Sequence, residues 1–278
     1  MKSIILILTL ITFISCQRTV IRSPASIQSE RKISIVFDID YTIVQPATDL
    51  NDSDVILIEG EHYKVNNWAR EMIESLSRHP NVEISFFSGG KKDRNQKLLR
   101  EIKMNTGESF LNIAGNVYSY SDLHQVQEEG RFSERLKKDL KILDFDLERT
   151  ILIDDNSLFT HEGQDKNMLW LGKTYHHYED FNKTYADIGN KKVLQEFIPE
   201  NFQQWFLARN KLKFVHELIE DAIRSEKTST VGFLDFIEAN KKTYIPYDEK
   251  ITSRYRSLFS KQFFNNQFTC SRAVLSFK

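Results

Sequence analysis

Four short polar patches lie along this chain in an order that suits the transfer of a phosphoryl group. The first holds two aspartates two residues apart, Asp38 and Asp40, directly after the apolar run Ile33–Phe37. If the extended backbone continues, the two carboxylates point to the same side. One can attack phosphorus, while the other protonates the leaving oxygen and then deprotonates a water molecule. The alternative is a solvated acidic turn, which the five apolar residues before the pair disfavour.

The second and third patches supply groups that can hold a phosphoryl oxygen. Ser88 follows the apolar run Val82–Phe87 and precedes two glycines, which let the backbone approach a ligand and direct N–H groups at it. Taken alone, an ordinary strand-to-helix turn explains this patch equally well. Lys137 and Lys138 fall in a segment, 133–143, whose leucine spacing predicts a helix. A lysine ammonium suits a phosphoryl group, although two lysines on a helix also describe a solvated face.

The fourth patch offers hard oxygen ligands for a metal ion. Asp154, Asp155 and Asn156 follow the apolar residues 150–153. Mg²⁺ prefers carboxylate and carbonyl oxygens, and adjacent carboxylates repel one another when no cation is present. The alternative is a helix N-cap or a turn. The sequence leaves open whether Asp154 or Asn156 joins Asp155 as a ligand.

These patches require a parallel sheet whose strands end together. Ligands of open α/β sheets bind at the carboxyl ends of the strands. The three apolar runs before the aspartates and Ser88 therefore predict neighbouring strands, with helices at 68–78 and 94–104 between them. A hairpin is expected at 55–65, with its turn near Gly60. The fold class is α/β.

A helical region is expected after the sheet. From residue 191 to 278, phenylalanines and tryptophans recur at helical spacing among charged residues, with breaks near 228–232 and 245–246. We therefore divide the chain into a sheet domain, 33–190, and a helical C-terminal region, 191–278. The aromatic residues of the second part are expected to form core rather than a binding surface.

Composition bounds the class of protein. The chain has 278 residues, of which 40% are hydrophobic and 28% charged, with a net charge of −1. These values are typical of a globular protein with one sizeable domain and an appendage. Because no excess of positive charge is present, nucleic acid is not expected as a partner.

The first residues predict export. Lys2, an apolar stretch over residues 4–14 and a small residue before Cys16 form the pattern of a secretory signal, too short to span a bilayer. Residues 13–16 resemble the lipoprotein box, which implies acylation of Cys16, a tether over 17–32 and a lipid anchor. The expected location is the bacterial cell envelope. The alternatives are a buried first element and a disulfide between Cys16 and Cys270.

The order of the patches resembles that of the haloacid dehalogenase superfamily of phosphohydrolases. Segments 137–140 and 146–157 are similar to the small phosphatases that act on the C-terminal tail of RNA polymerase II, the NLI-interacting-factor family. The likeness covers about residues 33–185. It implies a Rossmann-like core, a parallel sheet flanked by helices, in which the hairpin is a minimal insertion that leaves the site open.

The resemblance implies a role for each catalytic candidate. Asp38 would be the nucleophile and Asp40 the general acid and base. Ser88 would hydrogen-bond the phosphoryl group, and Lys138 would neutralise the charge that develops during transfer.

It also implies a Mg²⁺ site formed by Asp38, the backbone carbonyl of Asp40, Asp155 and Asn156. The chain departs from the family where Tyr41 replaces a usual glutamate and where two glycines follow Ser88. For this reason, and because of the export signal, the family's substrate is not carried over.

The sequence thus predicts an exported, lipid-anchored, Mg²⁺-dependent phosphomonoester hydrolase that works through an aspartyl-phosphate. Its substrate would be a phosphorylated small molecule, protein or peptide. Two alternatives stay open: an inactive binding module that keeps the fold, and a broad nucleotide or acid phosphatase of the envelope.

Overall fold

The computed structural model describes residues 32–47, 49–143, 147–183 and 195–275. The predicted signal, Cys16, nearly all of the tether and the boundary between 190 and 191 lie outside these residues. Cys270 lies in a helix, but its side chain is not described. No described helix is both long enough and apolar enough to cross a bilayer.

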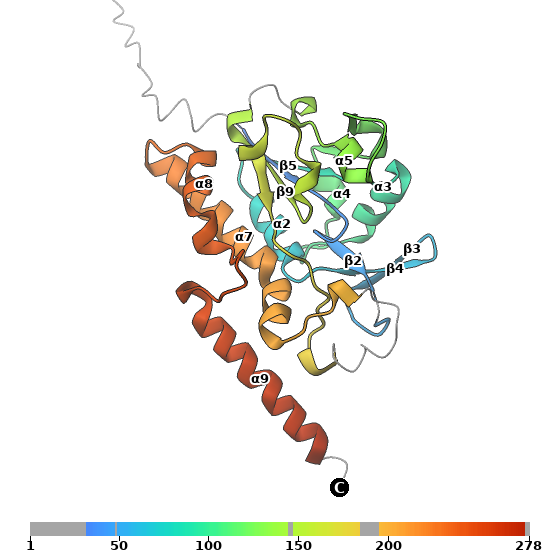
Figure 1. The fold of residues 1–278 in the computed structure, drawn as a ribbon, viewed down its shortest axis with the longest axis vertical. Helices are drawn as coiled ribbons and strands as arrows, with labels where there is room; N and C mark the ends of the chain where they lie inside the picture. The colour runs from blue at the N-terminus through green and yellow to red at the C-terminus, as the bar shows by residue number, and fades with distance from the viewer. Residues whose placement is uncertain (1–31, 48, 144–146, 184–194, 276–278) are drawn as a thin grey trace, which may run out of the picture.

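A parallel sheet of five strands forms the centre of the molecule (Figure 1). Its strands run in the order β10-β9-β1-β5-β6. The bounds are Ile33–Phe37 for β1, Val82–Phe87 for β5, Asn116–Tyr118 for β6, Thr150–Asp154 for β9 and Met168–Trp170 for β10. All neighbouring pairs are parallel. The predicted α/β class is confirmed, and so are the strands that were expected at the three apolar runs.

The register aligns the ends of the three central strands. Phe37 lies opposite Phe86 of β5 and Ile153 of β9. Asp38, Ser88 and Asp154 therefore come at nearly the same level, at the carboxyl edge of the sheet. Strands covered by elements on both faces are apolar throughout, which explains why they appear in the sequence as continuous hydrophobic runs.

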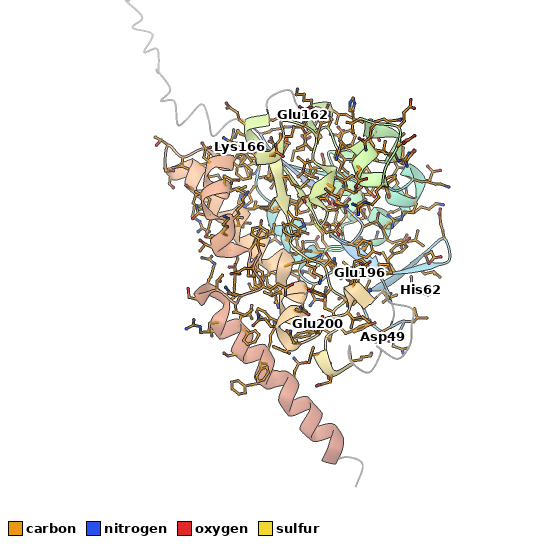
Figure 2. The ribbon with its side chains drawn as sticks, viewed as in Figure 1. Asp49, His62, Glu162, Lys166, Glu196 and Glu200 are labelled. Atoms are coloured by element: carbon orange, nitrogen blue, oxygen red, sulfur yellow. The ribbon has the colours of Figure 1, made fainter. Side chains whose placement is uncertain are left out.

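Helices cover the sheet, except for the last of them, which projects from the body (Figure 1). They are α2 (Ala69–Ser77), α3 (Lys92–Glu101), α4 (Phe110–Ile113), α7 (Phe202–Thr228), α8 (Phe233–Tyr244) and α9 (Arg256–Leu275). One hydrophobic core joins alternate residues of β1, such as Ile33 and Ile35, to Leu212 and Leu218 of α7. Side chains fill the space between the sheet and α7, whereas α9 projects from the body (Figures 1 and 2). The C-terminal helices thus share the core of the sheet.

The predicted hairpin is present and is larger than expected. Strands β3 (Val55–Ile58) and β4 (Glu61–Val65) are antiparallel, and β2 (Val44–Pro46) adds a third strand along β4. Glu59 and Gly60 form the turn, both with positive φ, of 53° and 87°. This small sheet leaves the main sheet just after Asp40 and returns to it through α2 (Figure 1).

The helix predicted over 133–143 is wrong. Only one helical turn forms, α5 (Phe132–Arg135), and the chain then extends as β8 (Leu136–Lys137), which pairs with β7 (His124–Gln125). A short 3₁₀ turn, Leu140–Ile142, follows. Because side chains of extended backbone alternate between opposite sides, Lys138 points inward and is fully buried, while Lys137 reaches the carbonyls of Ser133 and Leu158.

Candidate active site

The loop after β1 holds the first two carboxylates. Asp38 is 5% exposed, and its backbone N–H donates to the carbonyl of Ile153 at 2.9 Å. The chain then turns tightly, with Tyr41 at a φ of 60°, so that Asp40 stands at the edge of the cavity. Tyr41 is not a glycine, and a positive φ in such a residue costs free energy that the surrounding contacts must offset.

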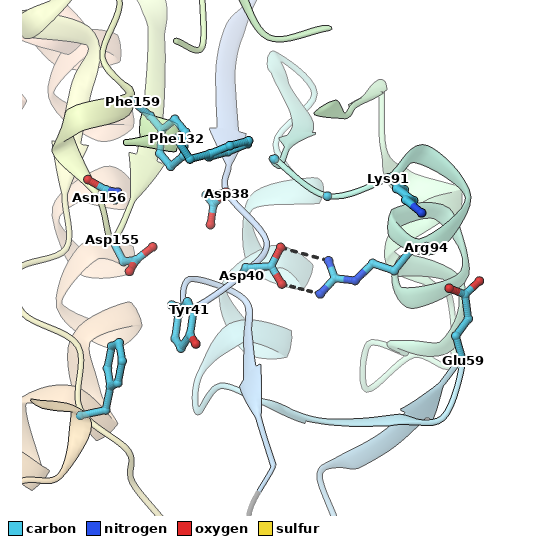
Figure 3. A pocket seen from close by; sticks show the side chains of 13 residues that line it. Asp38, Asp40, Tyr41, Glu59, Lys91, Arg94, Phe132, Asp155, Asn156 and Phe159 are labelled. Atoms are coloured by element: carbon cyan, nitrogen blue, oxygen red, sulfur yellow. Dashed lines mark hydrogen bonds and ion pairs between the residues drawn. The ribbon is translucent and has the colours of Figure 1, made fainter. Parts of the chain in front are cut away.

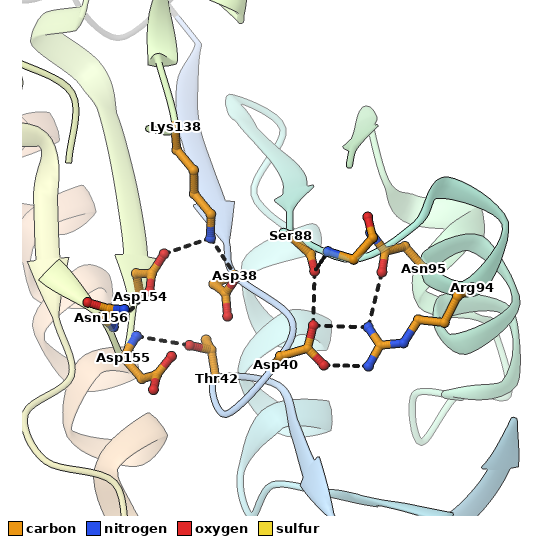
Figure 4. A network of polar contacts seen from close by, with 11 residues as sticks. Asp38, Asp40, Thr42, Ser88, Arg94, Asn95, Lys138, Asp154, Asp155 and Asn156 are labelled. Atoms are coloured by element: carbon orange, nitrogen blue, oxygen red, sulfur yellow. Dashed lines mark hydrogen bonds and ion pairs between the residues drawn. The ribbon is translucent and has the colours of Figure 1, made fainter. Parts of the chain in front are cut away.

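Lys138 links two aspartates below the cavity (Figure 4). Its ammonium group donates to Asp38 Oδ1 at 2.5 Å and to Asp154 Oδ2 at 2.7 Å. All three side chains are buried. The rings of Phe87 and Phe159 lie 5.9 and 5.0 Å from the Lys138 nitrogen and keep water from it.

Burial acts on both charges of this cluster. It opposes the charge of Lys138, but the carboxylates of Asp154 and Asp38 outweigh it and raise the pKa of Lys138. Burial also raises the pKa of Asp38 well above its usual range. The positive charge of Lys138 opposes this rise, but the negative charges of Asp154, Asp155 and Asp40 add to it. The lysine is therefore charged, and the carboxylates around it are more numerous than one cation can balance.

Asp155 lies on the other side of Asp38. Its N–H donates to Thr42 Oγ1 at 3.2 Å, and its carbonyl accepts from Trp170 Nε1 at 2.8 Å. Burial raises the pKa of Asp155 to about 6, against the opposing charge of Lys211.

The acidic groups can hold a metal ion. Carboxylate oxygens of Asp38, Asp154 and Asp155 lie within 4.8 Å of one another. Three hard oxygens this close suit Mg²⁺, and a divalent cation would relieve the repulsion that raises the pKa of Asp38. Asn156 also lines the cavity, but its Oδ1 accepts from the N–H of Leu158 at 3.0 Å, as an N-cap. Of the two alternatives that the sequence left open, the geometry therefore favours Asp154 over Asn156 as the metal ligand beside Asp155.

Ser88 and Asp40 are joined on the opposite side of the cavity. Ser88 Oγ donates to Asp40 Oδ2 at 3.0 Å and accepts from the N–H of Gly90 at 3.0 Å. A Cβ on Gly90 would lie 2.6 Å from Asn95 Oδ1, and one on Gly89 would lie 2.9 Å from the ring of Phe132. Packing against these neighbouring side chains therefore leaves little room for a Cβ at either glycine.

Arg94 makes a contact that the sequence did not predict. Its guanidinium grips both carboxylate oxygens of Asp40, at 3.0 Å for Nη1 to Oδ2, from the first turns of α3 (Figure 3). Asn95 supports it, since its Oδ1 accepts from Arg94 and its Nδ2 donates to the Gly90 carbonyl at 3.2 Å. The position of Arg94 near the start of the helix after Ser88 could have suggested this role. Lys91 and Lys92 lie at the same place in the sequence, however, so the pattern does not select Arg94 among them.

The cavity above these groups has a volume of roughly 650 Å³ and is open to solvent. Its walls differ in character (Figure 3). Lys91, Arg94 and Glu59 line one side, and Phe132 with Phe159 lines the other. The arrangement places a buried carboxylate, a fixed cation and a candidate metal site at the floor of one cleft. That combination serves nucleophilic attack on an anionic centre.

Of the comparisons with known proteins, the match to a family of proteins agrees with this chemistry. The profile of a family described as NLI interacting factor-like phosphatase matches residues 33–187, more than half of the chain. No curated protein matches the sequence.

Two solved structures are similar in part. One is the fission yeast RNA polymerase II CTD phosphatase Fcp1 in a substituted form bound to beryllium fluoride, with 15% identity over 77% of this chain and 71% of that one. The other is Fcp1, an essential RNA polymerase II CTD phosphatase, with 16% identity over 78% and 72%. Each has a TM-score of 0.41, so neither carries an argument about the site.

Proposed function

The chain belongs to the NLI interacting factor-like phosphatases, and from this premise we propose that it hydrolyses phosphomonoesters through an aspartyl-phosphate on Asp38. The protein is a phosphatase of the haloacid dehalogenase type. The observation that carries the mechanism is the buried cluster of Asp38, Lys138 and Asp154 at the floor of an open cavity.

In the first half-reaction, a carboxylate oxygen of Asp38 attacks phosphorus. A bond forms between that oxygen and phosphorus, and the bond from phosphorus to the leaving oxygen breaks. Asp40, which is protonated at the start of this step, gives its proton to the leaving group. Lys138 holds the other oxygen of Asp38, which fixes the attacking oxygen toward the cavity. Gly89 and Gly90 line the cavity, and in this proposal Ser88, which is buried beside them and bound to Asp40, hydrogen-bonds the phosphoryl group.

In the second half-reaction, Asp40 removes a proton from water. The water oxygen attacks phosphorus, the bond to Asp38 breaks, and inorganic phosphate leaves with the carboxylate of Asp38 restored. Arg94 and Ser88 hold Asp40 at the cavity edge, where it reaches the leaving group and then the water from the same position.

Mg²⁺ is proposed as the cofactor, held by Asp38 and Asp155 with the backbone carbonyl of Asp40, and with Asp154 behind them. When bound, it would neutralise charge on the phosphoryl group and orient it. The oxygen cluster described above fits this ion.

The substrate class and the location are also proposals. An open, partly aromatic cavity favours phosphate esters that stand out from their carrier, whether on small molecules, peptides or proteins. Export and acylation of Cys16 rest on the pattern of residues 1–16 alone.

The test is hydrolysis of an aryl phosphate by the purified protein, with Mg²⁺ and with a chelator. We expect turnover that requires Mg²⁺ and that falls by roughly 10³-fold or more in Asp38→Asn, which removes the nucleophile and keeps the shape. Asp165→Asn is the matched control, because Asp165 is exposed, belongs to the short turn Asp165–Asn167 and is not among the residues that line the cavity.

Turnover that persists in Asp38→Asn would refute the mechanism. Absence of turnover in folded protein, together with absence of Mg²⁺ binding by calorimetry, would instead favour a binding module that retains the phosphatase fold.

A further inference from the structure

Lys211 is a buried cation whose position the phosphatase family match does not cover. It lies on α7, beyond residues 33–187, and is 5% exposed. Its ammonium group donates to the backbone carbonyl of Tyr41 at 2.6 Å and to Thr174 Oγ1 at 3.1 Å. In the described part of the chain, no carboxylate forms an ion pair with it. Burying an ammonium group among neutral acceptors is costly, so the position needs an explanation.

The charges that Lys211 experiences are those of the active site. Burial lowers the pKa of Lys211 to about 8, and the carboxylates of Asp155, Asp38 and Asp154 oppose this fall, in that order. Lys211 is also the strongest cationic influence on Asp155, ahead of Lys138. The lysine is therefore a second cation, besides Lys138, whose charge acts on the acidic cluster.

The contact to Tyr41 holds the strained point of the catalytic loop. Tyr41 has a φ of 60°, directly follows Asp40 and would relax if nothing held it. Its carbonyl is bound by Lys211, and its ring stacks on Phe197 with centroids 5.2 Å apart and planes 7° apart. Asn66, inside the family match, also donates to this carbonyl, at the longer distance of 3.4 Å, whereas Lys211 and Phe197 lie beyond the match.

The opposite loop receives a similar restraint. The carbonyl of Asp155 accepts from Trp170 Nε1, and the indole of Trp170 stacks on Tyr247, with centroids 5.6 Å apart and planes 8° apart. Tyr247 belongs to the segment between α8 and α9. The C-terminal region thus supports the loop of Asp40 directly, through the Tyr41 carbonyl, and the loop of Asp155 indirectly, through Trp170.

We propose that Lys211 is a positioning residue of the phosphatase site, which fixes the Tyr41 carbonyl and with it the direction of Asp40, and that the C-terminal helices complete this site. The inference rests on the proposed function. It assigns to residues 195–275 a part in catalysis besides that of covering the sheet.

The test compares Lys211→Met with Lys213→Met in the full chain. Methionine keeps the apolar stem and the packing but loses the charge and the donor. Lys213 lies two residues along the same helix, over the ring of Trp68 at 4.3 Å and paired with Glu217, and has no contact with the site. We expect kcat for an aryl phosphate to fall 10- to 100-fold in Lys211→Met, with KM changed less than threefold and with an unchanged unfolding temperature. Lys213→Met keeps wild-type kinetics.

Rescue separates positioning from packing. A cavity of roughly 60 Å³ beside Lys211, lined also by Trp170 and Tyr247, leaves room for a larger cation. Lys211→Arg is therefore expected to retain at least a tenth of the wild-type kcat. If Lys211 acted only through packing, the reverse is expected: Lys211→Met would retain the wild-type kcat and Lys211→Arg would lose it.

Hydrogen exchange of the peptide that contains residues 38–44 gives a readout independent of turnover. Protection is expected to fall in Lys211→Met and to stay unchanged in Lys213→Met. If the wild type has no activity, the proposed function fails, and exchange still decides whether Lys211 holds the loop.

A kcat within twofold of wild type in Lys211→Met, or unchanged protection of residues 38–44, would overturn the inference. Should Lys211→Met not fold, Lys211→Gln, which keeps a donor and lacks the charge, takes its place with the same criteria.

Discussion

Charged side chains around the cavity leave the site negative when they are counted at their formal charges. Among the described residues that line the cavity or form its buried cluster, five carboxylates face four cations, which leaves one negative charge uncompensated. The carboxylates are Asp38, Asp40, Glu59, Asp154 and Asp155, and the cations are Lys91, Arg94, Lys138 and Lys211. A phosphoryl dianion would be repelled by that balance, and one divalent cation reverses its sign. Charge as well as geometry thus supports the proposed metal ion.

Lys138→Met tests the buried cluster at the level of one side chain. The variant leaves Asp38 and Asp154 facing each other without a cation. Breaking a buried ion pair from one side typically costs about 3–5 kcal/mol. We expect a loss of that order in the free energy of unfolding in urea, and loss of measurable aryl phosphatase activity.

Lys137→Met is the matched control, because its ammonium group reaches only backbone carbonyls at the surface. Retention of more than a tenth of the activity in Lys138→Met would contradict the role given to this lysine.

The residues that could be predicted from the sequence are those adjacent to strand ends. Asp38, Ser88 and Asp155 follow apolar runs, and the edge of a parallel sheet brings such positions together whatever the rest of the fold. Lys137 and Lys138 are both candidates by residue type, and only the resemblance to a family motif selects Lys138. Arg94 is one of several basic residues near the start of the helix after Ser88, and Lys211 reaches the site through the packing of α7, so no local pattern singles out either residue.

At the scale of elements, one carboxylate of α7, that of Glu220, makes polar contacts with the end of α2. Glu220 accepts from Ser75 Oγ at 2.7 Å and lies 3.0 Å from His79 Nε2, both at the end of α2. The contact with His216, one turn earlier on α7, is the main cause that lowers the pKa of Glu220 to about 2.

Glu220→Gln is expected to lower stability in a pH-dependent manner. Because the folded pKa lies below the ordinary value of 4.5, the contribution is fully present above pH 4.5 and is lost as the pH falls toward 2. Since the group is partly exposed, the difference from wild type at pH 7.5 should be about 1 kcal/mol. Urea unfolding at several pH values checks this. A difference that stays constant from pH 7.5 to pH 3 would show that the carboxylate charge is not what joins the helices.

The wrong helix at 133–143 shows where spacing misleads. Leu136 and Leu140 are both buried, as the helical pattern requires. In the structure, Leu136 is buried from the extended strand β8, which pairs with β7, and Leu140 is buried from the 3₁₀ turn. This backbone also turns the side chain of Lys138 inward. The strands could be predicted because burial on both faces leaves a continuous apolar run, which is compatible with fewer kinds of secondary structure.

At the scale of the whole molecule, the sheet depends on α7. Five large apolar residues along one face of this helix are buried in the core of the sheet. They are Leu212, Val215, Leu218, Ile219 and Ile223. Their burial contributes roughly 10 kcal/mol, which is comparable to the net stability of an ordinary domain.

We therefore expect that a fragment of residues 33–190 does not fold, although it spans the family match. The control is the chain from 33 to 278, which retains every helix of the core. Circular dichroism during thermal unfolding distinguishes the two. A cooperative transition in the short fragment would show that the predicted sheet domain is independent of the helices that follow it.

The stack of Trp170 on Tyr247 gives the site an optical reporter. The chain has three tryptophans, and Trp170 is 36% exposed while Trp205 is almost fully buried. Because the indole N–H binds the carbonyl of Asp155, any movement of that loop changes the environment of the ring. Emission from Trp170 should therefore follow occupation of the acidic cluster by a metal ion or phosphate, in real time and without a chromogenic substrate.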